Sequence, residues 1–356
     1  MDTFSGEFDN FFKLILVGRR MASLKAYIAT RALLVIPTVI ILLTLVFFIL
    51  RILPGDPIAS MVGQKVPPDV LERLREEAGL NKPIFVQYFE YLFNILHGDF
   101  GRSMIWGKRP VIAEIMDRFP ATLELTIFGF ILSVLIGVFT GSIAAFKRNS
   151  KLDASMRIYS IIAYSLFIPW FGMVLQMVFG VYLKILPIAG RITPGVEPER
   201  ITTLYVLDSI LTFNLNALSS SLIHLFLPSL TLGIVLSGAY TRLVRNNLID
   251  VLSQDYITAY KARGVKDRKI ALHAMKNAFI PVITLMGLQF AILLAGAVLT
   301  ETTFSWPGMG TFLLERIQYR DYNSVQGAIV FYALFVALIS LVVDVIYALI
   351  DPRVRY

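Results

Sequence analysis

The sequence predicts an all-α protein that crosses a membrane several times. Of its 356 residues, 56% are hydrophobic and only 16% are charged, whereas soluble domains are about 45–50% apolar and about 25% charged. The apolar residues are gathered into stretches of roughly 19 to 26 residues, the length that a helix needs to cross a hydrocarbon core of about 30 Å. The alternating pattern of barrel strands is absent. This balance argues against a water-soluble enzyme.

Six apolar stretches are predicted to be membrane-spanning helices, because a single chain in lipid must satisfy its backbone hydrogen bonds internally. They are 32–50, 122–146, 158–183, 222–241, 278–300 and 325–350. No small-residue cleavage pattern follows the first stretch, so we interpret it as a retained span and not as a signal peptide. The chain has no cysteine, which excludes disulfides and thiolate metal sites and leaves the redox compartment open.

The charges between the spans predict that both termini face the cytoplasm. The N-terminal segment 1–31, the second-to-third and fourth-to-fifth connections and the tail 351–356 together carry 19 Lys and Arg against 8 acids, and the other connections carry 14 against 15. An excess of Lys and Arg marks the cytoplasmic side. Juxtamembrane placement makes topology a better explanation of this basic charge than nucleic-acid binding, so no nucleic-acid partner is expected.

The connections on the opposite side include a long one, residues 51–121, which is predicted to be a folded outer cap. Helical patterns begin at Pro68 and after Pro83, and the cap either offers a docking surface or simply packs over the spans. The segment 1–31 carries aromatic residues at helical spacing ahead of Arg19 and Arg20, which is typical of a helix lying in the inner membrane interface. We assign it no function.

The fourth-to-fifth connection, residues 242–277, is the candidate functional site. It is strongly basic and is predicted to form two helices, 249–263 and 266–279, separated by Gly264, which can take a positive φ without steric cost. One face of the first helix carries Tyr256, Ala259, Tyr260 and Arg263, and the small Ala259 and Ala262 permit close approach of another surface. From chemistry alone it is either a helical knob for a groove on a cytoplasmic protein or a solvated basic loop.

Residues 255–284, DYITAYKARGVKDRKIALHAMKNAFIPVIT, resemble the EAA loop of inner-membrane permease subunits of ATP-binding-cassette importers, most closely the variant of the dipeptide and oligopeptide group. The resemblance extends over nearly the whole chain from about residue 27. It is carried by LPGDP at 53–57, GLNKPIFVQY at 79–88, HGDFGRS at 97–103, RFPATLEL at 118–125, ETTFSWPGMG at 301–310, RDY at 320–322 and DVIYALIDPRVRY from 344. The joint order and spacing of these short motifs make the match specific.

The resemblance implies a type I importer permease with six spans. It also implies a heterodimer with a second homologous permease, two cytoplasmic ATPases and an external solute-binding protein. In that family the loop helices rest in a cleft of the ATPase and transmit its movement to the spans. Carried onto this chain, the coupling residues would be Asp255, Tyr256, Ala259, Tyr260, Ala262, Arg263, Gly264, Asp267 and Arg268.

Two departures from the general motif leave the contacting side chains open. Thr258, Ala259 and Tyr260 stand where the motif has Glu and two Ala. Pro281 follows Gly264 by seventeen residues, about one helical turn more than in the general motif, which favours the peptide-group variant. That variant favours short peptides as substrates, with oligosaccharides and metal complexes as alternatives.

The chain lacks a phosphate loop of its own, since the nearest pattern, 101–109, has the wrong spacing and no Ser or Thr after the lysine. ATP and Mg²⁺ are therefore expected in partner subunits, with no cofactor, metal or catalytic residue here. The rival reading is an ion-coupled secondary transporter or channel that uses Glu124 and Asp344, the two acids within the spans. Both can also be explained as hydrogen-bonding partners between helices. An intramembrane enzyme is disfavoured because its sequence signatures are missing.

Alternating access of the spans is the expected mechanism. Its plausible bending points are Pro37, Pro169, Pro228, Pro281, Gly233 and Gly238. Residues that line the solute path cannot be chosen from the sequence, because a polar helix face can equally meet a sister subunit.

Overall fold

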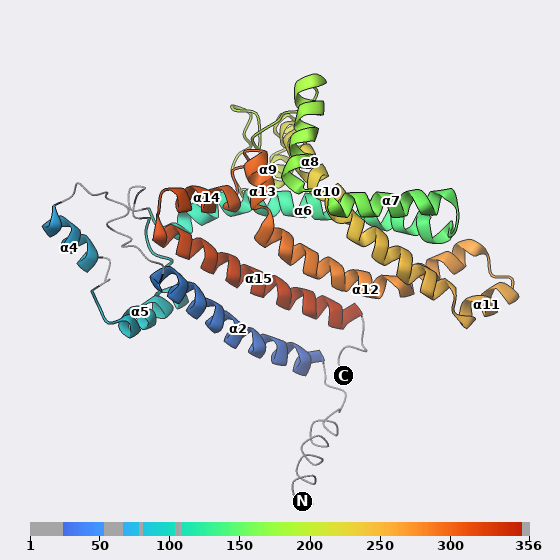
Figure 1. Ribbon diagram of the computed structural model, residues 1–356, viewed down its shortest axis with the longest axis horizontal. Helices are drawn as coiled ribbons and strands as arrows, with labels where there is room; N and C mark the ends of the chain where they lie inside the picture. Colours follow the sequence, from blue (N-terminus) through green and yellow to red (C-terminus); the bar gives the residue numbers. More distant parts are fainter. Residues whose placement is uncertain (1–23, 53–66, 78–80, 104, 106–108, 351–356) are drawn as a thin grey trace, which may run out of the picture.

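The computed structural model describes residues 24–52, 67–77, 81–103, 105 and 109–350 (Figure 1). Within them the regular structure is helical apart from one isolated bridge between Arg102 and Pro110, so the predicted all-α class is confirmed. Residues 1–23 of the predicted N-terminal segment and the tail 351–356 lie outside the described residues. The helices are α2 Leu24–Ile52, α4 Pro68–Glu77, α5 Ile84–Leu96, α6 Val111–Phe146, α7 Lys151–Ser165, α8 Ile168–Leu175, the π-helix η1 Gln176–Tyr182, α9 Tyr205–Leu211, α10 Leu215–Leu252, α11 Asp255–Ala262, α12 Asp267–Gly296, α13 Val298–Thr303, α14 Met309–Gln318 and α15 Tyr322–Ile350.

Five of the described helices, α2, α6, α10, α12 and α15, are long and apolar enough to cross a membrane. The number becomes six if α7 and the α8–η1 helix, which meet at an angle of 105°, are one broken span. Two of these helices extend well beyond the predicted spans, since α6 begins at Val111 and α10 runs from Leu215 to Leu252. Helix α12 instead ends at Gly296, before the predicted end of the fifth span at residue 300. Hydropathy identifies only the apolar middle of a helix, whereas backbone hydrogen bonding continues into its polar flanks.

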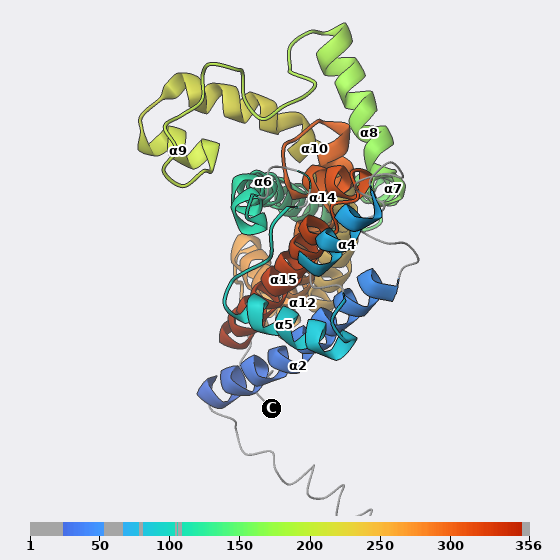
Figure 2. The same ribbon diagram turned by 90° about the vertical axis from the view of Figure 1, so that its left-hand side faces the viewer.

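The predicted third span, 158–183, is not one continuous helix. Helix α7 ends at Ser165 and α8 starts at Ile168. Pro169, in the first turn of α8, has no N–H to donate to the carbonyl of Ser165, and its ring would clash with that carbonyl. The break therefore follows from the proline, and α8, η1 and α9 project away from the other helices (Figures 1 and 2).

Small residues bring α10 close to α6 and α7. A Cβ on Gly137 of α6 would lie 2.4 Å from the Cβ of Tyr240, and a Cβ on Gly238 of α10 would lie 2.6 Å from Ser160 O. Gly233 likewise faces α6 at short range. Small residues allow helix backbones to approach closely within membranes, so Gly233 and Gly238 are close-packing positions. The prolines Pro37, Pro228 and Pro281 lie inside helices, as does Pro120.

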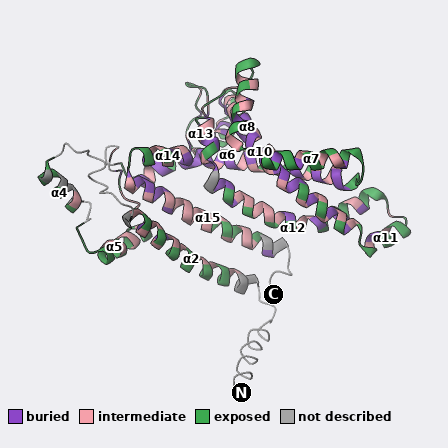
Figure 3. Ribbon diagram, viewed as in Figure 1, coloured by how far each residue is buried: buried purple, intermediate pink, exposed green. Residues whose placement is uncertain are grey.

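Short helices lie at opposite ends of the molecule. Figure 1 shows α11 at one end, with α4, α5 and α14 at the other. The buried residues are concentrated where α6, α10 and α12 pack together, and α2 is much more exposed (Figure 3). Helix α2 packs on α15 at the flank, where Arg31 pairs with Asp344 over 3.4 Å.

The predicted outer cap, 51–121, divides into two parts in the structure. Its last eleven residues, from Val111, are the first turns of α6 and pack against α14 and α15. Helix α5 has no buried residue, and Phe85, Phe89 and Leu96 are 70%, 67% and 83% exposed. The segment is therefore partly an extension of a long helix and partly exposed helices beside it.

Candidate coupling site

Helix α11 ends in a hydrogen-bonded turn that favours glycine at position 264. Val265 N donates to Tyr260 O over 3.1 Å, and Gly264 N donates to Lys261 O over 3.0 Å. These are the two bonds of a Schellman motif. Gly264 takes φ +67°, and a Cβ there would meet no atom within 4 Å. Glycine is therefore favoured at this position by its backbone angle and not by lack of space.

One face of the α11 turn, which we define as residues 255–268, is attached to α10 and α12. Ile257 is 1% exposed and packs into a cluster of buried residues from both helices. Asn277 Nδ2 of α12 donates to the hydroxyl of Tyr256 over 2.9 Å. The ring of Tyr260 lies 5.7 Å from that of His273, measured between centroids. The turn is thus attached to two of the long helices at once.

The opposite face of the α11 turn is open to solvent. Of the four residues predicted to share one face of the helix, Ala259 and Arg263 are exposed, whereas Tyr256 and Tyr260 are half-buried and contact α12. The remaining predicted coupling residues are all exposed: Asp255, Ala259, Ala262, Arg263, Gly264, Asp267 and Arg268. Because the exposed set contains small side chains beside charged ones, it offers a shallow surface that another protein can approach closely.

The boundaries of the two loop helices differ from the prediction. The first was expected over 249–263, but α10 continues to Leu252 and the chain bends at Ser253 before α11 starts at Asp255. The bend turns Ile257 inward. The second helix, predicted over 266–279 and leading into the fifth span, begins at Asp267 and runs without interruption into that span as α12.

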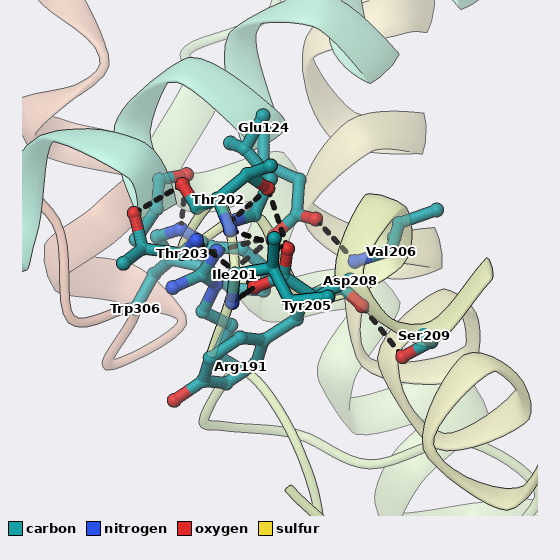
Figure 4. Close-up of polar contacts among 12 residues, drawn as sticks. Glu124, Arg191, Ile201, Thr202, Thr203, Tyr205, Val206, Asp208, Ser209 and Trp306 are labelled. Atoms are coloured by element: carbon teal, nitrogen blue, oxygen red, sulfur yellow. Dashed lines mark hydrogen bonds and ion pairs between the residues drawn. The ribbon is translucent and has the colours of Figure 1, made fainter. Parts of the chain in front are cut away.

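A buried ion pair joins α6 to the loop that precedes α9 (Figure 4). Arg191 donates from Nη2 and Nε to Glu124 Oε2 of α6 over 2.8 and 3.0 Å, and both side chains are less than 10% exposed. Glu124 Oε1 accepts a bond from Val206 N of α9 over 2.7 Å. The Arg191 guanidinium also lies 3.9 Å from the centre of the Tyr205 ring. Glu124 is therefore fully engaged in fixing the α9 segment to α6.

A second buried carboxylate, that of Asp208 in α9, holds the loop before this helix. Its carboxylate accepts bonds from the backbone N–H groups of Ile201, Thr202 and Thr203 and from the hydroxyl of Thr202. Burial acts to raise the pKa of Asp208, but these donors outweigh it and the pKa lies below its usual value. The loop before α9 is thus held by a buried carboxylate.

Glu301 of α13 caps the start of α14. Its Oε2 accepts bonds from Gly310 N over 2.7 Å and Thr311 N over 3.2 Å, and its Oε1 accepts one from Thr122 Oγ1 over 2.5 Å. A Cβ on Gly308 would lie 2.3 Å from the carboxylate, so the glycine makes room for it. Burial raises the pKa of Glu301 to about 7, against the lowering effect of these donors.

Four of the motifs quoted for the resemblance contact one another in pairs. ETTFSWPGMG contacts RFPATLEL through Glu301 and Thr122, and Trp306 Nε1 donates to Ala121 O over 2.8 Å. HGDFGRS meets RDY where Ser103 Oγ donates to Asp321 Oδ2 over 2.5 Å. Sequence reasoning did not identify Glu301 as a site residue. The signal for it was an acid followed at positions 308 and 310 by glycines.

Two further ion pairs each join a shorter helix to a long one. Arg245 of α10 pairs with Asp153 of α7 over 2.7 Å, and Arg316 of α14 pairs with Glu114 of α6 over 3.0 Å. Neither pair was predicted, because the partners are far apart in the sequence. No group of three His, Cys, Asp or Glu side chains suited to a metal ion occurs in the described part of the chain.

Comparisons with known proteins agree on one kind of protein. Residues 137–356 match the family described as "Binding-protein-dependent transport system inner membrane component", and residues 23–126 match the one described as "Binding-prot-dependent transport system membrane comp, N-term". The chain is 39% identical over 332 residues to the dipeptide transport system permease protein DppB of Alkalihalophilus pseudofirmus, across 93% of this chain and 99% of that protein. It is 37% identical to DppB of Escherichia coli strain K12 over 93% of this chain and 98% of that protein. It is 38% identical to the glutathione transport system permease protein GsiC of the same strain, over 93% of this chain and 99% of that protein.

Proposed function

The chain belongs to the family of binding-protein-dependent transport system inner membrane components, and from this premise we propose that it is the permease subunit of an ATP-driven importer of short peptides. The proposed substrate class rests on relatives named for dipeptide and glutathione transport. The proposed partners are a second permease, two cytoplasmic ATPases that bind ATP and Mg²⁺, and an external solute-binding protein. Hydrolysis takes place in the ATPases, so this subunit is not itself an enzyme.

The α11 turn is the proposed ATPase contact, with the N-terminus, the C-terminus and this turn on the cytoplasmic side. The observation that carries the proposal is that the turn has one buried face and one exposed face. Ile257 is buried against α10 and α12, whereas Ala259 and Arg263 are exposed. A force applied to the outward face reaches two membrane-spanning helices through Ile257. The excess of Lys and Arg on the connections at this end supports the orientation.

Rocking of the helices then opens and closes the solute path. Pro228 and Pro281 interrupt the hydrogen bonding of α10 and α12, the two helices to which the α11 turn is attached. A missing backbone hydrogen bond lowers the resistance of a helix to bending. Movement of the α11 turn is therefore expected to bend these two helices at their prolines.

The rival function, an ion-coupled transporter or channel, depends on Glu124 and Asp344 being available to ions. Glu124 accepts bonds from Arg191 and from Val206 N, and Asp344 pairs with Arg31. Both acids thus serve as contacts between segments of the chain, which favours the importer over the rival.

Gly264→Asn tests the coupling proposal, because asparagine tolerates a positive φ while adding a side chain to the outward surface. Gly98→Asn is a matched control at the other end of the molecule. Gly98 also takes a positive φ, +77°, has no atom within 4 Å of its ideal Cβ, and follows the same pair of hydrogen bonds after α5. The assay is peptide uptake and peptide-stimulated ATPase activity of the assembled complex.

We expect Gly264→Asn, and more strongly Gly264→Trp, to reduce both activities while the variant permease still assembles in the membrane. Gly98→Asn should leave both unchanged. Normal stimulated ATPase activity and uptake in Gly264→Trp would rule out the α11 turn as the coupling contact.

A further inference from the structure

A groove of about 600 Å³ lies between α7, α10 and α12. Ligand pockets commonly enclose roughly 300–1,000 Å³. Its walls are mostly apolar, and they carry a few polar side chains: Tyr164 from α7, Arg242 and Asn246 from α10, and Thr284 and Gln289 from α12. The groove thus combines an apolar body with separated polar groups, which is the usual composition of a site for a small amphipathic ligand.

The polar side chains of α12 argue that the groove contains water. Thr284 and Gln289 lie in the middle of the apolar stretch 278–300, and among the described residues neither side chain has a hydrogen-bonding partner. An unsatisfied polar group facing lipid costs about 1–3 kcal/mol or more. Polar residues within membrane helices therefore usually face a water-filled path or another protein.

Arg242 brings an unneutralised positive charge to the same groove. Its side chain is exposed, and its guanidinium lies 5.5 Å from the centre of the Tyr164 ring. Within the described part of the chain it has no acidic partner, whereas Arg245, three residues along α10, is paired with Asp153. A planar guanidinium can bind a carboxylate through two parallel hydrogen bonds. The groove is therefore suited to an anion with an apolar or amide-containing body.

We propose that this groove is a stretch of the path of the imported solute, and that Arg242 there binds a carboxylate of the peptide in transit. The proposal rests on the proposed function, since a short peptide supplies both the carboxylate and the mixed polar body. Asn246, Thr284 and Gln289 are the groups that can hydrogen-bond the peptide amides. A phospholipid would match Arg242 and the apolar wall, but its acyl chains would leave Thr284 and Gln289 unsatisfied.

The absence of cysteine from the chain allows a direct test with a single introduced thiol. Thr284→Cys is placed in the groove of the assembled complex, and its labelling rate is measured with anionic and cationic methanethiosulfonates of matched size. Leu33→Cys on α2, a position that is 67% exposed and lies in the apolar stretch 32–50, is the lipid-facing control. A lipophilic maleimide reports thiols that only lipid can reach.

We expect both charged reagents to modify Thr284→Cys, the anionic one about tenfold faster because a cation in a cleft concentrates anions. Adding Arg242→Gln should make the anionic and cationic reagents label at similar rates, because the positive charge is lost. Adding Arg242→Lys should preserve the faster labelling by the anionic reagent. The transported peptide, supplied with ATP and the binding protein, should slow labelling. Leu33→Cys should react only with the lipophilic reagent.

Labelling of Thr284→Cys by the lipophilic reagent alone would overturn the proposal in favour of lipid, and no labelling by any reagent would overturn it in favour of a protein interface. Charge-selective labelling that peptide turnover does not slow would overturn the carboxylate assignment to Arg242. A complex that shows charge-selective labelling but imports no peptide would refute the proposed function and leave a water-filled, cation-lined groove.

Discussion

Replacing Ile257 by alanine should disconnect the α11 turn from the long helices without unfolding them. Ile257 is the only buried residue of α11, and it packs against buried residues of α10 and α12. The other described attachments of the helix are the Tyr256–Asn277 hydrogen bond and the contact of Tyr260 with His273. Tyr256 and Tyr260 also pack against this cluster from its edge. Removing the Ile257 side chain beyond Cβ therefore removes the one fully buried apolar contact of α11.

The size of the effect follows from the burial of Ile257, which is 1% exposed. Truncating a buried isoleucine to alanine costs about 2–5 kcal/mol of stability. A single neutral hydrogen bond such as that of Tyr256 contributes only about 1 kcal/mol, so it is too weak to hold α11 in place by itself. A loss of about 3 kcal/mol raises the population of the detached state about a hundredfold, since 1.4 kcal/mol corresponds to a factor of ten. Ile257→Val, at about 0.5–1.5 kcal/mol, should raise it by about tenfold or less.

Two measurements follow the detachment in the assembled complex. Hydrogen exchange of the α11 amides should become about a hundredfold faster, and the ATP hydrolysed per peptide imported should rise because the motor no longer moves α10 and α12. The matched control is Ile115→Ala, a 0% exposed isoleucine in the cluster at the opposite end. It should lower stability by a similar amount while the ratio of ATP to peptide stays unchanged.

The reasoning fails if Ile257→Ala speeds exchange of the α11 amides but leaves the ratio of ATP to peptide at the wild-type value. It fails equally if Ile115→Ala changes that ratio as much as Ile257→Ala does.

Two further predictions concern the other contacts. Burial raises the folded-state pKa of Glu301 from 4.5 to about 7. Its contribution to stability is therefore fully present below pH 4.5 and is lost as the pH rises through 7, a change of about 3 kcal/mol. The thermal stability of Glu301→Gln relative to wild type should improve between pH 4.5 and pH 8, and parallel plots of stability against pH for the two proteins would contradict this. Gly137→Ala places a Cβ 2.4 Å from the Cβ of Tyr240, so it should push α6 away from α10. Thermal unfolding should show a free energy of unfolding lower by about 1–3 kcal/mol. The control Gly190→Asn, at a positive φ with no atom near its ideal Cβ, should have little effect.

Composition and apolar blocks were sufficient to predict the helical class, because the bilayer imposes both the length and the hydrogen bonding of a span. They could not predict the break between Ser165 and Ile168, since a proline inside a long apolar stretch is compatible with a kink or with a sharp bend. The neighbours of α8 decide between the two, as Gly172 packs against Phe304. Hydropathy likewise could not reveal that α6 continues back to Val111, where its partners are α14 and α15.

The sequence was sufficient to locate the candidate site along the chain, but not to say which of its side chains are exposed. The basic loop and Gly264 were visible in the sequence, and the Schellman bonds explain the glycine. Which side chains face outward was not predictable, because the bend at Ser253 rotates α11 and turns Tyr256 and Tyr260 toward α12. The pairing of Glu124 with Arg191 joins positions 67 residues apart, and only the folded chain brings them together.

The central claim, that the outward face of the α11 turn contacts an ATPase, is tested most directly at Ala259. This residue is exposed, and the chain has no cysteine of its own, so the thiol of Ala259→Cys can be labelled by itself. A water-soluble maleimide should modify Ala259→Cys quickly in the permease alone and slowly once the ATPase subunits are bound, while Leu96→Cys, a position that is 83% exposed at the other end, reacts equally in both. Equal labelling of Ala259→Cys with and without the bound ATPases would contradict the account.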